Sequence, residues 1–311
     1  MENLYSQEDL LKEFGYILER INKASFESSP FKHLIMFDFL SPEHFQAVTE
    51  ANEINRPEFS STENLIQDLL DTGYQVQNFP GCTTSKEEYL KCYNSNKWPV
   101  ESGDMEGFGL TLRLRKIETP LISRLLIFLN SDLFSETLKN RFEIKTKSNV
   151  NTSVQKYLHA YEISPHPDER NKALTYLLNI NTNPKAEKDQ MHTFLMQFKP
   201  ERRYIYDFWK YNPTVERCWV PWNWCEKVVE TSCNNSFIIF APDDTTLHAV
   251  KLNYNHLKYQ RTQIYGNLFY ENNPSKSWMN YDDIDLLKEK PIKYSKIKAM
   301  IPKTIKKLIK G

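Results

Sequence analysis

The chain has 311 residues, of which 40% are hydrophobic and 26% are charged, and it contains only eight Gly. These proportions fit a globular protein with a buried core and exclude a collagen-like fibre or a low-complexity chain. The net charge is zero, but residues 288–311 hold nine Lys against one acid, which leaves 31 basic and 39 acidic residues elsewhere. A slightly acidic body does not favour a nucleic-acid groove, so no nucleic-acid partner is expected.

No stretch approaches the ~18 apolar residues of a membrane span. The opening sequence, MENLYSQEDLLKEFGYI, carries acids where a signal peptide needs a basic region followed by an apolar one. The five Cys form no Cys-x-x-Cys pair, which favours reduced thiols over a disulfide framework or a zinc knuckle. We therefore expect a cytoplasmic protein.

The first half of the chain is predicted to be mainly helical. Residues 3–22 have apolar residues at helical spacing, which predicts an opening amphipathic helix. A strand is expected over 33–39, and then a helix to about residue 52 with Ser41 as its N-cap and Pro42 at its first position. Residues 55–105 are polar and predict loops with short elements. Residues 118–140 predict a helix in two pieces, broken near Asn130 and Ser131.

From about residue 150 the pattern changes to short apolar runs separated by turn residues. Such spacing favours antiparallel strands in a sandwich or barrel. The expected architecture is therefore a β-sandwich core with helices packed on one face. The predicted strands are SVQKYLHAYEI, KALTYLLNIN, HTFLMQFK, RRYIYDFW, SFIIFAP and RTQIYGNLFY.

The segment YEISPHPDERNKALTYLLNIN contains the residues that point to chemistry. His166 and Asp168 are two apart, so in an extended segment both side chains reach the same face. His248 follows a later apolar strand and a Pro-Asp-Asp turn, and Arg261 comes 13 residues after it. Two His and one carboxylate on one face form a facial triad, which suits Fe(II) better than the sulfur-rich set of structural zinc.

A facial triad leaves three positions on an octahedral iron. Two of them can be chelated by the 1-carboxylate and 2-keto oxygens of 2-oxoglutarate, and the third can take dioxygen. Arg261 can hold the far carboxylate of 2-oxoglutarate through a paired, charge-assisted contact. A lone His-x-Asp is a weak signal, which the later His and the Arg strengthen.

With these residues the sequence resembles the 2-oxoglutarate/Fe(II)-dependent oxygenase superfamily, in its prolyl-hydroxylase-like branch. PFKHLIMFDFLSPEHF is similar to the opening strand and helix of the family, SPHPDERNKALTYLLNIN to its metal loop, and FAPDDTTLHAV to the segment with the second His. The resemblance covers roughly residues 30–270, with a poor match at 55–115. It implies an α+β fold with a double-stranded β-helix core (jelly-roll, cupin-like) and helices packed on one face.

The resemblance implies that His166, Asp168 and His248 are metal ligands and catalytic, with Arg261 as the co-substrate anchor. Thr175, Leu177 and Asn179 share one face of the next strand by period-2 alternation and are expected at the co-substrate. The family often has a Tyr near the position of Asn179, whose amide keeps hydrogen-bonding ability with a shorter reach. Tyr157 is a further candidate for the same pocket. Arg261-Thr262-Gln263 stands where the family commonly has Arg-x-Ser.

The expected organisation is an N-terminal helix in 1–29, an oxygenase domain over 30–270 and a C-terminal extension over 271–311. The extension ends in a basic amphipathic segment, and residues 291–311 could contact a membrane surface or a partner protein. A helix packed on the body with its Lys exposed is the alternative.

Other candidates have simpler interpretations. His192 could replace His248 as a ligand, but no anchoring Arg follows it at a suitable distance. His256 is expected to be solvated in a polar loop. The aromatic segment 204–225 is expected to be a core strand and a packed loop, although its Trp side chains could also form a substrate lid.

Two functions from different classes follow. The first is a dioxygenase that couples decarboxylation of 2-oxoglutarate, to succinate and CO2, with hydroxylation of a C–H bond in a small-molecule, sugar-type or carrier-bound substrate. Its cofactors would be Fe(II), 2-oxoglutarate and dioxygen. The second is a catalytically silent binding or scaffold protein with the same fold. A zinc hydrolase is disfavoured because no general base accompanies the motif.

Overall fold

A computed structural model of the chain describes residues 5–79, 82, 84–98, 107–183, 185, 188–189 and 191–271. The basic segment predicted at the C-terminus therefore lies outside the described residues. Among the helices that are described, none has the length and apolarity needed to span a bilayer. These helices are α1 (Gln7–Lys23), α2 (Pro42–Glu50), α3 (Thr62–Asp71), α4 (Lys86–Ser95), α5 (Pro120–Leu129), α6 (Asp132–Arg141) and α7 (Tyr204–Tyr211), with 3-10 turns at Pro200–Arg202 and Trp222–Trp224.

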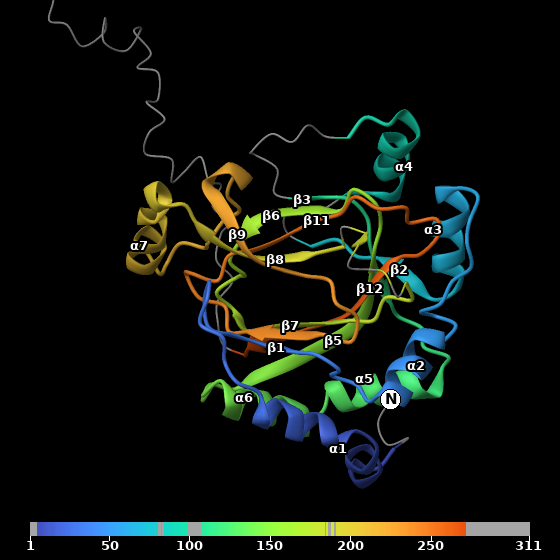
Figure 1. Ribbon diagram of the computed structural model, residues 1–311, viewed down its shortest axis with the longest axis horizontal. Helices are drawn as coiled ribbons and strands as arrows, with labels where there is room; N and C mark the ends of the chain where they lie inside the picture. The colour runs from blue at the N-terminus through green and yellow to red at the C-terminus, as the bar shows by residue number, and fades with distance from the viewer. Residues whose placement is uncertain are drawn as a thin grey trace, which may run out of the picture.

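The strands form two antiparallel sheets that face each other (Figure 1). The larger sheet has the order β1-β10-β7-β12-β5-β4-β2, and the smaller has the order β3-β6-β11-β8-β9. The predicted mixture of helices with antiparallel strands is confirmed. The strands are β1 (His33–Met36), β2 (Tyr74–Val76), β3 (Gly107–Phe108), β4 (Thr111–Leu114), β5 (Ser148–Tyr157), β6 (Glu162–His166), β7 (Lys172–Asn179), β8 (Thr193–Phe198), β9 (Cys225–Thr231), β10 (Phe237–Phe240), β11 (His248–Lys251) and β12 (Arg261–Tyr270).

Strand alternation divides the larger sheet into an apolar face and a polar face. On β7, Leu174, Tyr176 and Leu178 belong to the main hydrophobic core, which also includes buried residues of α1, α5 and α6. The intervening Thr175 and Leu177 instead line a cavity between the two sheets. Because successive side chains point to opposite faces, the same strands serve the core and the cavity. Helices α1, α2, α5 and α6 lie on the outer side of this sheet (Figure 1).

Local signals located several helices correctly. Ser41 caps α2 by accepting a hydrogen bond from the backbone of His44, with Pro42 in the first turn. The predicted break near Asn130 is confirmed, because α5 ends at Leu129 and Ser131 caps α6. The polar stretch 55–105 holds more structure than expected, since it contains α3, β2 and α4. Ser side chains before α3 and α4 cap both helices.

The strand predicted at 202–209 is wrong, because this segment forms α7. Its aromatic residues favour strands on propensity. Ile205 and Trp209, four residues apart, are fully buried in a cluster with Phe198 of β8. This spacing matches one face of a helix, so tertiary packing overrides the local preference. The helices therefore do not all lie on one face, since α7 packs beside the smaller sheet.

His256 is buried, so the expectation that it is solvated is wrong. Its Nδ1 accepts a hydrogen bond from the backbone N–H of His159 at 3.1 Å, and its Nε2 lies 3.0 Å from the Thr62 hydroxyl at the start of α3. Burial, with a smaller effect of His159, lowers the pKa of His256 to about 3. The ring therefore joins α3 to the turn after β5 in its neutral form.

Burial of His256 predicts a specific loss of stability in acid. Between pH 6.5 and 3 the unfolded chain binds a proton at this ring that the folded chain cannot bind, so the free energy of unfolding falls as the pH falls. The contribution is about 1.4 kcal/mol per pH unit within this window. In His256→Gln the free energy of unfolding, measured by urea unfolding, should fall less steeply between pH 6.5 and 4 than in the parent protein. Above pH 7.5 the free energy of unfolding should depend on pH in the same way in the variant and the parent protein. Equal slopes in acid would contradict the assignment.

Gly266 of β12 lies opposite Tyr176 of β7 in the sheet register. A Cβ atom at Gly266 would overlap the buried Tyr176 ring, which also contacts the Phe134 ring edge-on. Because Gly266 has no side chain, the Tyr176 ring can pack across β12 at this position.

Substitution Gly266→Ala should therefore lower the free energy of unfolding by about 1–3 kcal/mol, the usual cost of overpacking. Gly15→Ala in α1 is the matched control, because a Cβ there meets only an ordinary contact with Leu11. It should raise stability by about 0.5–1 kcal/mol through helix propensity. Urea midpoints of both variants measure the difference. An unchanged midpoint for Gly266→Ala would refute the predicted overlap.

Candidate metal centre and cavity

A cavity of about 410 Å³ lies between the two sheets. Its walls combine side chains of β4, β5, β7 and β12 from the larger sheet with side chains of β6, β8 and β11 from the smaller one. This volume is within the range of small-molecule sites. The residues that line the cavity include Gln77, Arg113, Gln155, Tyr157, Ile163, His166, Asp168, Glu169, Lys172, Thr175, Leu177, Trp219, His248, Arg261, Tyr265, Asn267 and Phe269.

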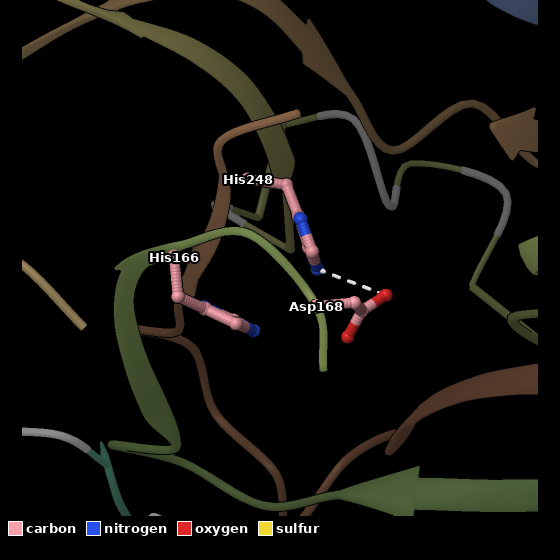
Figure 2. A group of neighbouring side chains, drawn as sticks. All are labelled: His166, Asp168 and His248. Atoms are coloured by element: carbon pink, nitrogen blue, oxygen red, sulfur yellow. Dashed lines mark ion pairs between the residues drawn. The ribbon is translucent and has the colours of Figure 1, made fainter. Parts of the chain in front are cut away.

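His166, Asp168 and His248 converge at one end of this cavity. His166 ends β6, Asp168 lies in the loop that follows, and His248 opens β11 directly opposite His166. One ligand atom from each residue lies within 4.8 Å of the others, and all three side chains are buried. Figure 2 shows the two imidazoles and the carboxylate turned toward a common point. The structure thus brings together the three predicted ligands.

A bulge in β6 aims His166 at this point. The pairing of β11 with β6 shifts between His248, which faces His166, and Val250, which faces Ile163. Ile163 and His166 are three residues apart, so regular alternation would place them on opposite faces. The extra residue turns both toward the cavity.

Both imidazoles offer Nε2 as the free ligand atom. His166 Nδ1 lies 2.8 Å from the carbonyl of Ser164, and His248 Nδ1 lies 3.1 Å from that of Thr246. A carbonyl only accepts hydrogen bonds, so each Nδ1 carries the proton and each Nε2 presents a lone pair. Burial, with the neighbouring His248, lowers the pKa of His166 to about 3. Burial also lowers the pKa of His248, so both rings are neutral at neutral pH.

Asp168 is held as an ionised carboxylate. Lys172 Nζ lies 2.6 Å from Oδ1, the Thr175 hydroxyl donates to Oδ2, and Oδ2 lies 3.9 Å from Nε2 of His248. Burial by itself would raise the pKa of Asp168, but Lys172 and then the two His hold it well below its usual range. Lys172 therefore occupies Oδ1 while Oδ2 faces the imidazoles. Two neutral nitrogens and one carboxylate oxygen on one side fit a divalent transition metal.

Lys172 is a site residue that sequence pattern did not reveal. On regular alternation it would face away from Thr175, three positions later. The β7 to β12 register skips a residue here, because Leu268 pairs with Leu174 and Phe269 pairs with Lys172. This bulge turns Lys172 into the cavity, where its Nζ also lies 3.2 Å from the hydroxyl of Tyr265. Only the structure of the neighbouring strand could have indicated this.

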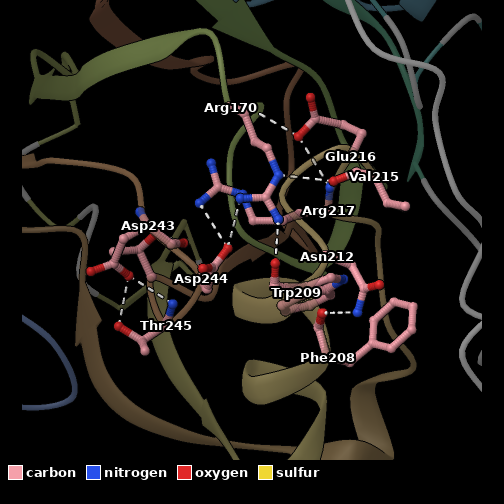
Figure 3. A network of polar contacts seen from close by, with 11 residues as sticks. Arg170, Phe208, Trp209, Asn212, Val215, Glu216, Arg217, Asp243, Asp244 and Thr245 are labelled. Atoms are coloured by element: carbon pink, nitrogen blue, oxygen red, sulfur yellow. Dashed lines mark hydrogen bonds and ion pairs between the residues drawn. The ribbon is translucent and has the colours of Figure 1, made fainter.

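Arg170 anchors the loop that carries Asp168. Its guanidinium donates to the carbonyls of Val215 at 2.9 Å and Trp209 at 2.8 Å, and it lies 3.1 Å from Oδ1 of Asp244 (Figure 3). The loop is thereby attached to the end of α7 and to the turn before β11.

Glu216 and Asp244 complete this network. Oε1 of Glu216 accepts the backbone N–H groups of Arg170 and Arg217, each at 3.0 Å. Asp244 also lies 3.7 Å from Arg217, and it precedes His248 by four residues (Figure 3). The loops beside Asp168 and His248, two candidate ligands, are thus fixed to each other by ion pairs outside the cavity.

Arg261 lies in the cavity wall, fully buried, at the start of β12. Its Nε donates to the carbonyl of Met191 at 3.0 Å and its Nη2 to the hydroxyl of Thr193 at 2.8 Å. Its Nη1 is buried and has no hydrogen-bond partner among the described residues. The guanidinium lies 4.9 Å from the centre of the Tyr157 ring. A buried cation with an unused hydrogen-bond donor can bind an anionic group.

The other predicted pocket residues have different positions. Tyr157, Thr175 and Leu177 line the cavity. Asn179 is not among its lining residues, because its amide donates to Cys233 and Ser236 and accepts from Gln263 at 2.7 Å. It contacts the cavity wall through Gln263, its partner on β12, without lining the cavity itself.

His192 is outside the metal group, and its ring packs against Phe194. Of the four Trp of the aromatic segment, the last three divide between the two interpretations. Trp219 lines the cavity, with its ring 6.0 Å from that of His166. Trp222 instead donates to Glu162 at 2.7 Å, and Trp224 is buried beneath Arg202.

No protein-family model and no curated protein matches the sequence. Among solved structures, the chain is similar to a prolyl-4-hydroxylase from Pseudomonas putida, with 8% identity over 83% of this chain and 100% of that one and a TM-score of 0.44. A prolyl hydroxylase from Trichoplax adhaerens, in complex with a hypoxia-inducible-factor peptide, has 13% identity over 87% and 96% and a TM-score of 0.44. AviO1 from Streptomyces viridochromogenes has 13% identity over 85% and 98% and a TM-score of 0.36. These similarities are too low to assign the chain to a family.

Proposed function

We propose that the protein is an Fe(II)- and 2-oxoglutarate-dependent oxygenase that hydroxylates a C–H bond of a small molecule. The observation that carries this proposal is the convergence of His166, Asp168 and His248 in a cavity that also contains the buried Nη1 of Arg261. The three side chains form a binding site suited to a metal, and the guanidinium of Arg261 is suited to bind an acidic co-substrate.

The strand order supports a double-stranded β-helix as the fold. The eight strands from β5 to β12 divide equally between the two sheets. Their order is β10-β7-β12-β5 in the larger sheet and β6-β11-β8-β9 in the smaller sheet. Two four-stranded sheets wound from one chain in this manner are the pattern of a jelly roll. The ligand-bearing ends of β6 and β11 lie side by side in it.

The donor set favours iron. Two imidazole nitrogens and one carboxylate oxygen leave open positions on an octahedral Fe(II), whereas structural zinc sites are closed by four ligands, commonly Cys-rich. When bound, iron with 2-oxoglutarate and dioxygen would couple decarboxylation of the co-substrate, to succinate and CO2, with hydroxylation of the substrate.

The residues of the chain have separate tasks in this proposal. Thr175 and Lys172 hold Asp168 so that one oxygen faces the metal. Arg261 binds the far carboxylate of 2-oxoglutarate, beside the Tyr157 ring. Ile163 and Trp219 restrict water at the metal end, which strengthens the electrostatic contacts inside.

Removal of a ligand should abolish metal binding. Asp168→Ala and His248→Ala should each weaken Fe(II) affinity by at least about 100-fold, more than the loss of an outer-shell partner. Anaerobic titration with Fe(II) and 2-oxoglutarate should give a weak visible charge-transfer band in the parent protein and none in these variants. His192→Ala is the control and should keep the band. A band of full intensity in Asp168→Ala would rule out this ligand set.

Replacement of Arg261 should weaken co-substrate binding while leaving metal binding intact. A hydrogen bond to a charged group contributes about 1.5–3 kcal/mol, so Arg261→Gln should raise the Kd for 2-oxoglutarate by about 10- to 100-fold. Arg261→Lys should be intermediate because it keeps the charge and loses the paired donors. The Kd follows from the band intensity against 2-oxoglutarate concentration, and Mn(II) affinity is the control. An unchanged Kd would place the co-substrate elsewhere.

A further inference from the structure

A second cationic region lies on the cavity wall, away from Arg261. Arg113 of β4 lines the cavity, and Arg115 follows two residues later. Neither guanidinium is within ion-pair distance of an acid among the residues that the structure describes. The acids of the cavity lining, Asp168 and Glu169, lie at the metal end.

Arg113 is only partly satisfied. Its Nη2 donates to the side chain of Asn151, while its Nε is buried and has no hydrogen-bond partner within the described part of the chain. Burial, and then the like charge of Arg115, lower the pKa of Arg113. Arg115 is exposed and donates to Gln77 at 2.8 Å. A buried, unpaired N–H beside a second positive charge is unfavourable unless an anion binds there.

A neighbouring amide adds another donor. Gln155 of β5 is buried and lines the cavity, and its Oε1 accepts a hydrogen bond from the Tyr157 hydroxyl at 2.7 Å. Its amide N–H groups make no hydrogen bond with any residue in the described ranges. Because Gln155 pairs with Arg113 across the sheet, these donors form one group.

The sheet register gives the distance from this group to the metal end. Asn151, which accepts from Arg113, pairs with Asn267 of β12, and Asn267 pairs with Thr175 of β7. Thr175 in turn contacts Asp168. Two strand spacings of ~4.8 Å separate Asn151 from Thr175, so the cationic region lies roughly 10 Å across the sheet from the metal end.

The wall between the two ends suits an organic molecule. Tyr265 and Phe269 line it from β12, and Tyr157 lines it from β5. Aromatic rings pack well against apolar or ring-shaped groups.

We propose that the substrate is an anionic small molecule whose carboxylate or phosphate group binds Arg113 and Arg115 while its reacting carbon lies beside the metal ligands. This assignment rests on the proposed function, because it takes the bound molecule as the substrate. Binding of the anion itself depends only on the wall of the cavity. Lys172 is already paired with Asp168, and Arg261 is reserved for the co-substrate, so Arg113 is the lining cation left for the substrate, with the exposed Arg115 beside it.

The first test needs neither metal nor co-substrate. Phenylacetate, benzyl phosphate and neutral benzyl alcohol are titrated calorimetrically into the full-length, EDTA-treated protein. At least one of the two acids should bind at least tenfold more tightly than the alcohol, and the tighter acid identifies the anionic group. If neither acid binds more tightly than the alcohol, the proposal is overturned.

Variants locate the binding. Arg113→Gln should weaken binding of the preferred acid at least tenfold, and Arg113→Lys should weaken it less. Arg203→Gln is the matched control, because Arg203 is exposed at the start of α7 and does not line the cavity. Thermal melts check that each variant is folded. Equal affinity in folded Arg113→Gln and the parent protein would overturn the proposal.

A second arm separates this site from the co-substrate site. The same acid is titrated into protein saturated with Mn(II) and 2-oxoglutarate under argon. Binding should persist, whereas competition with 2-oxoglutarate would place the acid at Arg261 and refute the separate site. Absence of the iron charge-transfer band would count against the proposed function alone, since the metal-free titration still reports on Arg113.

Discussion

The antiparallel pairing of β6 with β11 is the constraint on which the candidate site depends. It places His248 directly opposite His166, and the two rings lie 4.4 Å apart between their centres. Asp168 follows His166 by two residues, so the same pairing brings the carboxylate into reach. Backbone hydrogen bonds of a sheet therefore set the geometry of two candidate ligands. The ion pairs of Arg170 and Asp244 then fix the loops that continue from these strands.

Among the charged groups of the cavity lining, Lys172 and Asp168 partner each other. A buried ion pair contributes little net stability, but removing one partner leaves an uncompensated charge and is costly. Lys172 and Asp168 form such a pair, and Thr175 satisfies the second oxygen of Asp168. The N–H groups of Arg113 and Arg261 that lack a hydrogen-bond partner among the described residues are therefore exceptions in this lining. They lie where the proposed function and the further inference each require an anion.

The larger sheet explains how one chain contains both a core and a polar cavity. Its outer face packs on α1, α5 and α6 through apolar residues, and its inner face carries Gln155, Thr175 and Asn267. Gly266 lets Tyr176 cross beneath β12 without disturbing the inner face. Polar groups can line the cavity because the helices on the other side bury enough apolar surface to stabilise the sheet.

Local features of the fold and of the site could be predicted from the amino-acid sequence. Ser41 as a helix cap, the helix break near Asn130, the period of β7, and the spacing of His166, Asp168 and His248 were predictable because each depends on residues close in the chain or on the chemistry of a ligand type. Features that depend on residues distant in the chain became apparent only from the three-dimensional fold. The bulge opposite Phe269 turned Lys172 inward, and a hydrogen bond from Gln263 engaged Asn179, which does not line the cavity. Packing against Phe198 made 204–211 a helix, and the register of β4 with β5 placed Arg113 in the cavity. Side-chain direction across a sheet is set by the neighbouring strand, and no local pattern contains that information.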